Sequence, residues 1–242
     1  MMLKLSKIIL NILLVALVLV ITLLWFRENK LFFISQVKVE GNEVLTYEEV
    51  LNYAQLDLSK DIFEMDLGAV EERLITHNLI EDVNISRFLP SALKIKITEK
   101  DIIANVSDEK LIALDSSGEI IETDDYFALY DLPIITGVNL IPDSLGRLYA
   151  PPLIREMITI LKAIRQINLQ LYHDISEINF RRNYGVMLFL RKKTIPIILG
   201  YGNYQDKMYN LSLIYNMLSE REELLSLKSI DVRFRGQVVV RN

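Results

Sequence analysis

The sequence predicts an α+β protein in which one apolar, membrane-spanning helix precedes two folded units, the second built on a β-rich mixed sheet with packed helices. Three observations support this class. Residues 8–26 form a run without a charged residue. The next part of the chain follows a strand–helix–helix–strand–strand pattern. The remainder alternates short strand patterns with two helical ones.

The apolar run extends from Ile8 to Phe26 and contains only Asn11 and Thr22 as polar residues. A helix of this length spans about 28 Å, close to the thickness of a bilayer's hydrocarbon core. A cleaved signal peptide has a shorter core and a small-residue cleavage site. A buried helix normally has a polar face. Neither pattern is found, so we predict an uncleaved transmembrane helix over residues 8–27.

The flanking charges indicate the orientation of this helix. A short tail, residues 1–7, carries Lys4 and Lys7, and Arg27 and Lys30 follow the run. The short tail favours a cytoplasmic N-terminus with the rest of the chain exported. The exported part holds 24 basic and 32 acidic residues, which argues against general nucleic-acid binding. The absence of cysteine excludes a disulfide framework.

The first exported unit begins with strand-like alternation from Phe33 to a turn at Gly41. Thr46 and Glu49 form a capping-box pattern, in which each side chain bonds the other residue's backbone N–H. Asp66 stands where it can cap a second helix. The pattern therefore predicts one strand followed by two short helices.

Two further strands complete this unit. We predict them at residues 80–88 and 92–98, joined by a turn at 89–91. Apolar residues alternate with lysines along the second strand, which is typical of a half-buried strand. Two helices over one face of a small sheet form no obvious pocket, so we expect the unit to present an edge or a face to another chain.

The remainder, residues 101–242, is predicted to be the β-rich unit. Strands are expected in a hairpin over 111–121 and at 133–137, 175–180, 185–191, 195–199, 230–234 and 238–240. Helices are expected from the prolines at 151–152 to about residue 164 and over 205–218.

Basic residues concentrate on the last strands of this unit. Residues 175–200 contain five basic residues and one acid, and residues 229–242 contain three and one. Positive charge gathered on one sheet of an acidic protein predicts an acidic partner segment, which arginine binds well through bidentate pairs. The alternative is that these charges guard a sheet edge or form a solvated face.

We find no arrangement of residues that predicts catalysis, a cofactor or a metal. His77 and His173 lack cysteine or carboxylate neighbours at ligand spacing. The carboxylate pairs at 124–125 and 222–223 diverge in either a helix or a strand. The glycines of 200–202 lack the spacing of a phosphate loop. Half-buried helix positions, rather than a recognition surface, are predicted for the tyrosines Tyr201, Tyr204, Tyr209 and Tyr215.

Four segments resemble the FtsQ/DivIB family, namely residues 34–42, 61–67, 87–100 and 229–234. The third is the most specific, because the family has an Arg-x-x-Pro turn, an alternating strand and a closing Glu there. The resemblance implies a POTRA-type domain over 33–100 and a β-rich domain over 101–242 that ends in an edge strand. Asp101 departs from the family, which often has a proline near this point.

The resemblance further implies a non-enzymatic divisome scaffold in the cytoplasmic (inner) membrane at the division septum, with most of the chain extracytoplasmic. The implied partners are FtsB-like and FtsL-like (DivIC-like) division proteins and other divisome membrane proteins, the first adding a strand to the terminal strand. The matching positions are Arg233, Phe234, Arg235 and Gly236 on the last strand and Arg182, or alternatively Arg181, on a neighbouring strand. An envelope translocation or assembly component is the alternative, but it would carry several POTRA units or barrel strands. An anchored envelope hydrolase would need a catalytic constellation, and none is found.

Overall fold

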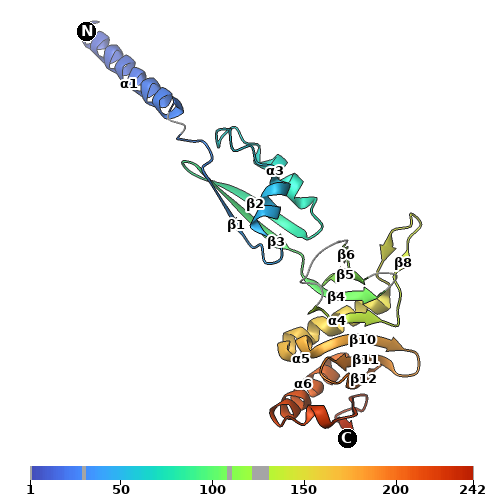
Figure 1. Ribbon diagram of the computed structural model, residues 1–242. Coiled ribbons are helices and arrows are strands. Elements are labelled where there is room, and N and C mark those ends of the chain that lie inside the picture. Colours follow the sequence, from blue (N-terminus) through green and yellow to red (C-terminus); the bar gives the residue numbers. More distant parts are fainter. Residues whose placement is uncertain (1, 29–30, 108–110, 122–130, 242) are drawn as a thin grey trace. The chain divides into compact units, whose positions relative to one another are not determined.

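The computed structural model describes residues 2–28, 31–107, 111–121 and 131–241 (Figure 1). The chain divides into two compact units, residues 1–99 and residues 100–242. Both units combine helices with a sheet, which confirms the predicted α+β class. The predicted carboxylate pair at 124–125 lies outside the described residues.

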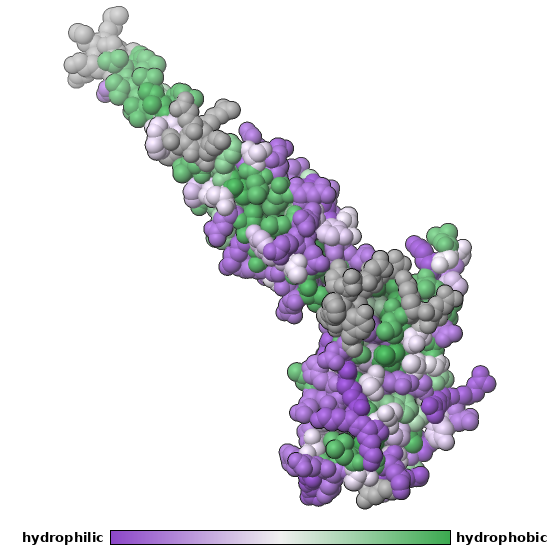
Figure 2. All heavy atoms as spheres, viewed as in Figure 1, coloured by the Kyte–Doolittle hydropathy of each residue, from purple (hydrophilic) through white to green (hydrophobic). Residues whose placement is uncertain are grey.

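The first element is α1 (Met2–Glu28), which contains the apolar run and includes residues 2–7 of the predicted tail. Its described large apolar side chains, from Ile9 to Trp25, are all more than half exposed. Figure 2 shows the hydrophobic colouring along this helix. Among the residues that the structure describes, no helix is long and apolar enough to cross a membrane. The transmembrane span over 8–27 stays a prediction.

The rest of the first unit has the predicted strand–helix–helix–strand–strand order. Its elements are β1 (Gln36–Glu40), α2 (Tyr47–Ala54), α3 (Leu67–Ile75), β2 (Ile80–Phe88) and β3 (Ala92–Glu99). β3 lies between the other two strands, parallel to β1 and antiparallel to β2. Leu93, Ile95 and Ile97 of β3 are buried, as are apolar residues of α2 and α3. Since β3 is the central strand, β1 and β2 are the two edges of this small sheet.

Local hydrogen bonds fix where both helices begin. The Thr46 hydroxyl accepts the Glu49 N–H at 3.2 Å, and the Glu49 carboxylate accepts the Thr46 N–H at 2.7 Å. Asp66 accepts the Ala69 N–H at 3.2 Å. Both predicted helix caps are confirmed.

Residues 87–100, the segment with the most specific family resemblance, stabilise two loops of this unit through the side chains of Arg87 and Glu99. The Glu99 carboxylate accepts the three backbone N–H groups of residues 43–45 at 2.8–3.1 Å. The Arg87 guanidinium donates to the carbonyls of Ile62 and Met65, each at 2.7 Å. A charged group that satisfies several backbone groups at once fixes the loop that carries them.

The second unit is built on a nine-stranded mixed sheet with the order β14-β13-β12-β11-β10-β7-β4-β5-β6. In chain order its strands are β4 (Ile102–Ser107), β5 (Leu111–Asp115), β6 (Ile120–Ile121), β7 (Ile134–Thr136), β10 (Ile175–Arg181), β11 (Gly185–Leu190), β12 (Pro196–Gly200), β13 (Ser229–Asp231) and β14 (Val239–Arg241). A separate two-stranded hairpin consists of β8 (Ile141–Pro142) and β9 (Leu148–Tyr149). The helices are α4 (Pro152–Ile167), α5 (Leu169–Asp174), α6 (Tyr204–Glu220) and the short 3-10 helix η2 (Leu224–Ser226).

The three longer helices of this unit share one core with the sheet. Its buried side chains include Ile154, Met157 and Leu161 of α4, Leu171 of α5, Leu211 and Tyr215 of α6, and Ile135, Ile178, Leu188, Ile197 and Ile230 of the strands. Removing these apolar side chains from water is the main stabilisation of the fold. The periodicity of the sequence does not predict β4, α5 or the β8–β9 hairpin.

The structure shortens the strand that we predicted over residues 230–234. β13 ends at Asp231, and the next strand, β14, begins at Val239. The Asp231 carboxylate accepts the backbone N–H of Arg233 at 3.1 Å. An aspartate that bonds the backbone two residues on favours a turn over a ladder, so the chain leaves the sheet here.

Candidate partner-binding surface

The terminal strand β14 forms one end of the nine-stranded sheet. It pairs antiparallel with β13 and has no second neighbour in the described sheet. β13, in contrast, has β12 on its other side. An edge strand presents unpaired N–H and C=O groups to which another chain can bond. Residues 229–231 are thus enclosed by a strand on each side, and residues 239–241 keep one open flank.

The connection between β13 and β14 carries Arg233, Phe234, Arg235 and Gly236, so none of these four residues lies on the last strand as predicted. The Arg233 guanidinium pairs with the Asp231 carboxylate through two hydrogen bonds, of 2.9 and 2.7 Å. Asp231 is buried. The arginine holds the pKa of Asp231 below its ordinary value, and the aspartate raises the pKa of Arg233. The pair therefore stays charged, and the aspartate sets the direction of the arginine side chain.

A glycine allows Arg233 to lie across the end of β12. Gly200 has a φ of +73°, and a Cβ at this position would lie 2.8 Å from Cγ of Arg233. A Cβ on Gly185 would lie 2.4 Å from the carbonyl of Gly200. Because Gly185 has no side chain, the start of β11 can lie close to the end of β12. Because Gly200 has none, the end of β12 can lie close to the Arg233 side chain.

Arg182 lies in the turn between β10 and β11, and Arg181 is the last residue of β10. We predicted that Arg182, or alternatively Arg181, lies on a strand next to the terminal strand. This prediction is wrong, because β11 and β12 separate β10 from β13. The turn nevertheless lies at the same end of the sheet as Arg233. The Tyr201 hydroxyl donates to the Arg182 carbonyl at 2.5 Å, and the pairing of Val186 with Gly200 aligns the strand ends.

Arg181 and Arg182 differ in their contacts. The Arg181 Nε donates to Asn179 at 3.2 Å, and its guanidinium lies over the Phe189 ring at 5.9 Å. The side chains of Arg182 and Arg235 form no ion pair with any residue that the structure describes. Within the described residues Arg181 also lacks an ion pair, but at this end only Arg182 and Arg235 have guanidinium groups with no hydrogen bond, ion pair or ring contact.

We call this end of the sheet the basic aromatic surface. It comprises Arg182, Tyr184, Tyr201, Arg233, Phe234 and Arg235. The three aromatic side chains are 45%, 58% and 50% exposed in the order given. Arg233 also lies over the Phe234 ring at 6.0 Å. Exposed aromatic residues beside arginines are typical of protein interfaces.

Sequence reasoning missed both tyrosines of this surface. Tyr201 was predicted at a half-buried helix position, but it lies in the turn before α6. Tyr209 of α6 is also exposed and Tyr215 is fully buried, so among the four only Tyr204 occupies the predicted half-buried position. The signal that marks Tyr201 is its place between Gly200 and Gly202, which is typical of a turn and not of a helix.

The remaining basic residues lie at the opposite end of the same sheet. They are Arg191, Lys192 and Lys193 after β11 and Arg241 at the end of β14. Arg191 forms an ion pair with Asp131 at 2.9 Å, and Lys193 donates to the carbonyl of Leu225. The basic residues of the last strands therefore do share one sheet, but they divide between its two ends.

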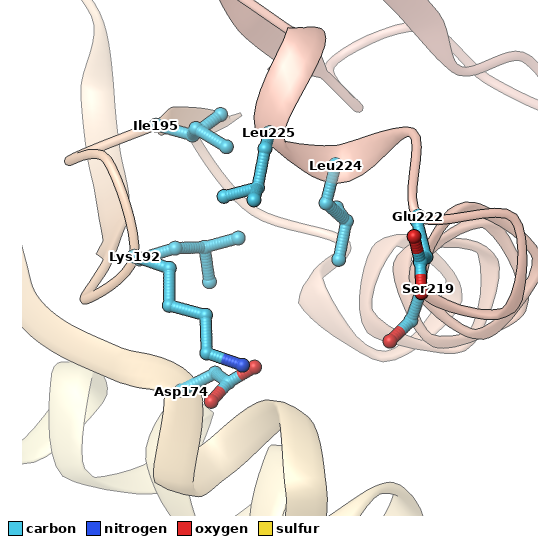
Figure 3. Close-up of a pocket in the computed structure, with 8 residues that line it drawn as sticks. Asp174, Lys192, Ile195, Ser219, Glu222, Leu224 and Leu225 are labelled. Carbon is cyan, nitrogen blue, oxygen red and sulfur yellow. The ribbon is translucent and has the colours of Figure 1, made fainter.

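A cavity of about 400 Å³ opens at that second end (Figure 3). It is lined by Asp174, Leu190, Lys192, Ile195, Ser219, Glu222, Leu224 and Leu225. In Figure 3 the Lys192 ammonium points toward the Asp174 carboxylate, with Leu224 and Leu225 across the opening. Asp174 already accepts a hydrogen bond from the Tyr215 hydroxyl. The lining has one hydroxyl, on Ser219, and no histidine to activate it, so the cavity does not indicate a reaction.

The two histidines make structural contacts. His77 Nδ1 accepts the Leu79 N–H at 3.2 Å, and its ring meets that of Tyr53 at 4.4 Å. The His173 ring lies 5.5 Å from that of Tyr172. Within the described part of the chain, no three His, Cys, Asp or Glu residues are grouped as metal ligands.

Comparisons with known proteins cover both units. Residues 32–100 match the family model of the FtsQ-type POTRA domain, and residues 102–240 match the model described as FtsQ/DivIB, C-terminal related. The cell division protein FtsQ of Geotalea daltonii is 26% identical over 213 residues, which cover 87% of this chain and 76% of the relative. FtsQ of Geobacter sp. is 26% identical over 90% of this chain and 80% of its own length. DivIB of Clostridium tetani is 24% identical over 88% and 80%. The chain belongs to the FtsQ/DivIB family of cell-division proteins.

Proposed function

We propose that this chain is a non-enzymatic scaffold of the divisome that binds a segment of a partner division protein by strand addition to β14. The open flank of β14 is the observation that carries the proposal. Pairing an extended segment with such an edge uses main-chain hydrogen bonds for affinity and side-chain contacts for specificity. FtsB-like and FtsL-like (DivIC-like) proteins are the proposed partners, and no cofactor or metal is required.

The basic aromatic surface supplies the side-chain contacts in this proposal. A partner strand on β14 continues past the connection that carries Phe234 and Arg235. The exposed charges of Arg182 and Arg235 favour carboxylates in the adjoining part of the partner segment, because arginine binds carboxylates through paired hydrogen bonds. Phe234 serves as the apolar anchor of this contact. Arg182 is preferred to Arg181, because Arg181 already contacts Asn179 and Phe189.

We further propose that α1 anchors the chain in the cytoplasmic (inner) membrane at the septum, with its N-terminus inside and both folded units outside the cytoplasm. The uncharged run from Ile8 to Phe26 supports this part of the proposal. The full chain is then expected to remain with membranes after salt and carbonate washes and to be released by detergent. Protease added outside the membrane is expected to digest the folded units. Recovery of the full chain in the soluble fraction would contradict the anchor.

Binding of partner segments to the full-length chain in detergent tests the interface. Phe234→Asp is expected to weaken binding of an acidic FtsB-like segment by about tenfold or more. The substitution removes the proposed apolar anchor and places a carboxylate where the partner's own carboxylates would lie. Tyr209→Asp is the matched control, because Tyr209 is an equally exposed aromatic residue on α6 (59% against 50%). If Phe234→Asp and Tyr209→Asp bind the segment with equal affinity, the basic aromatic surface is not part of the interface.

Strand addition is tested separately with Val240→Pro. Proline has no N–H and disrupts strand pairing, so partner binding through β14 is expected to be lost. Val240 lies in the middle of β14 and away from the basic aromatic surface. Binding that survives this substitution would contradict strand addition while leaving a side-chain contact possible.

A further inference from the structure

The small sheet of the POTRA unit also has a long free edge. β2 comprises nine residues and pairs with β3 alone. A strand of this length with one open side is a ready template for pairing with another chain, and proteins usually protect such edges.

A glutamate of α3 bonds to the middle of this edge. The Glu71 carboxylate accepts the backbone N–H of Ile85 at 2.9 Å. Because a peptide N–H has one hydrogen, this group faces away from β3. In an antiparallel ladder the N–H and C=O of one residue point to the same side, so Ile85 belongs to the outward row of groups that an added strand would use. Glu71 therefore occupies a donor that another strand would need.

The next residue provides a natural contrast. Glu72 has the same side chain one position further along α3, but it is exposed, and among the described residues no hydrogen bond or ion pair reaches it. Of these two adjacent carboxylates, only that of Glu71 is directed at the sheet edge. A charged acceptor on a backbone N–H forms a stronger bond than a neutral one.

We infer that Glu71 is a specificity-determining residue that closes β2 to other strands and so directs strand addition to β14. The choice of β14 as the open edge rests on the proposed function. The protection of β2 rests on the Glu71–Ile85 bond alone. With Glu71 removed, the available occupant of β2 is the β2 edge of a second copy of this chain, because two identical antiparallel edges can pair around a two-fold axis.

The experiment compares Glu71→Met, Glu71→Gln and Glu72→Met in the full-length chain in detergent. Methionine keeps the length and helix propensity of glutamate and removes the acceptor. Glutamine keeps an oxygen acceptor. Two quantities are measured: hydrogen exchange of the segment 80–88, and self-association by sedimentation over a range of protein concentrations.

Glu71→Met is expected to raise exchange of the Ile85 amide about tenfold or more at low protein concentration. It is also expected to produce dimers as the concentration rises. Glu71→Gln and Glu72→Met are expected to resemble the unsubstituted chain in both measurements. Glu71→Ala serves as a second variant if the methionine disturbs the packing of α3.

Two results would overturn the inference. In one, Glu71 variants without an acceptor exchange and associate like Glu72→Met. In the other, their Ile85 amide exchanges faster but the chain stays monomeric at every concentration, which reduces Glu71 to a local structural bond. The experiment contains no partner segment, so a failure of β14 to bind partners leaves its outcome unchanged.

Discussion

The two sheets of this protein end in different ways. Each edge of the small POTRA sheet receives a side chain from its own helices: the Tyr47 hydroxyl donates to the Val37 carbonyl of β1 at 3.1 Å, and Glu71 accepts the Ile85 N–H of β2. For β14, at the end of the nine-stranded sheet, the described residues provide no such bond. The difference is that side chains bond to both edges of the small sheet, whereas β14 keeps an open flank within the described sheet. Under our proposals, this difference decides which edge binds a partner.

The largest expected effect tests whether the two sheets are independent. Gly41 and Gly137 each have a positive φ, and a Cβ on them would lie 2.1 and 2.3 Å from the backbone oxygens of Ile97 and Phe180. We expect each alanine substitution to lower the free energy of unfolding of its own unit by about 3 kcal/mol. Hydrogen exchange read segment by segment measures both units in one sample.

Gly146→Ala is the control for this pair. Gly146 also has a positive φ, but nothing lies within 4 Å of its added Cβ, so it isolates the backbone conformation from the steric contact. A single substitution at Gly41 that destabilises both units equally would contradict the separation of the two sheets.

A second effect concerns the loop that follows β1. Glu99→Ala removes the acceptor of the three N–H groups of residues 43–45. We expect the free energy of unfolding of the POTRA unit to fall by about 2 kcal/mol, because bonds to charged groups are the stronger kind. Denaturant unfolding followed by exchange in this unit provides the measurement. Glu43→Ala, which removes an exposed carboxylate from the same loop, is expected to change little.

A smaller effect is expected at the β1 edge itself. Tyr47→Phe removes the hydroxyl that donates to Val37 and keeps the ring, so we expect a cost of about 1 kcal/mol in the POTRA unit. Tyr53→Phe is the matched control, since Tyr53 is similarly exposed (46% against 40%). Equal unfolding midpoints in denaturant for the two variants would show that the edge bond contributes nothing.

The smallest effect is a dependence on pH at the same edge. Lys38 and Lys94 hold the pKa of Glu40 at about 2, against an ordinary value of 4.5. Because the folded state lowers this pKa, the stabilisation is complete above pH 4.5 and is lost as the pH falls toward 2. The Glu40 side chain is still 33% exposed to solvent, which screens its ion pairs, so the effect is small. The unsubstituted chain is expected to lose slightly more stability than Glu40→Gln between pH 5 and pH 2.5, and an equal loss would contradict the assignment.

Local patterns in the sequence were sufficient for most of the POTRA unit. Alternation places β2 at residues 80–88, as the structure has it, because a strand with one buried face repeats every two residues. The caps at Thr46 and Asp66 follow from short-range bonds between a side chain and the backbone three residues on. The family assignment also came from contiguous segments. These features depend on neighbours in the chain, so the sequence by itself determined them.

The candidate surface and the protected edge depend on the tertiary structure. Arg182 and Arg233 lie at one end of a sheet although β10 and β13 are not neighbours, and Tyr201 joins this surface from a third segment. The bond between Glu71 and Ile85 connects a helix to a strand 14 residues away. Strand order and the approach of a side chain to a distant backbone group arise from packing between elements. No pattern within one element contains that information, so only the folded chain decided which edge is closed and which is open.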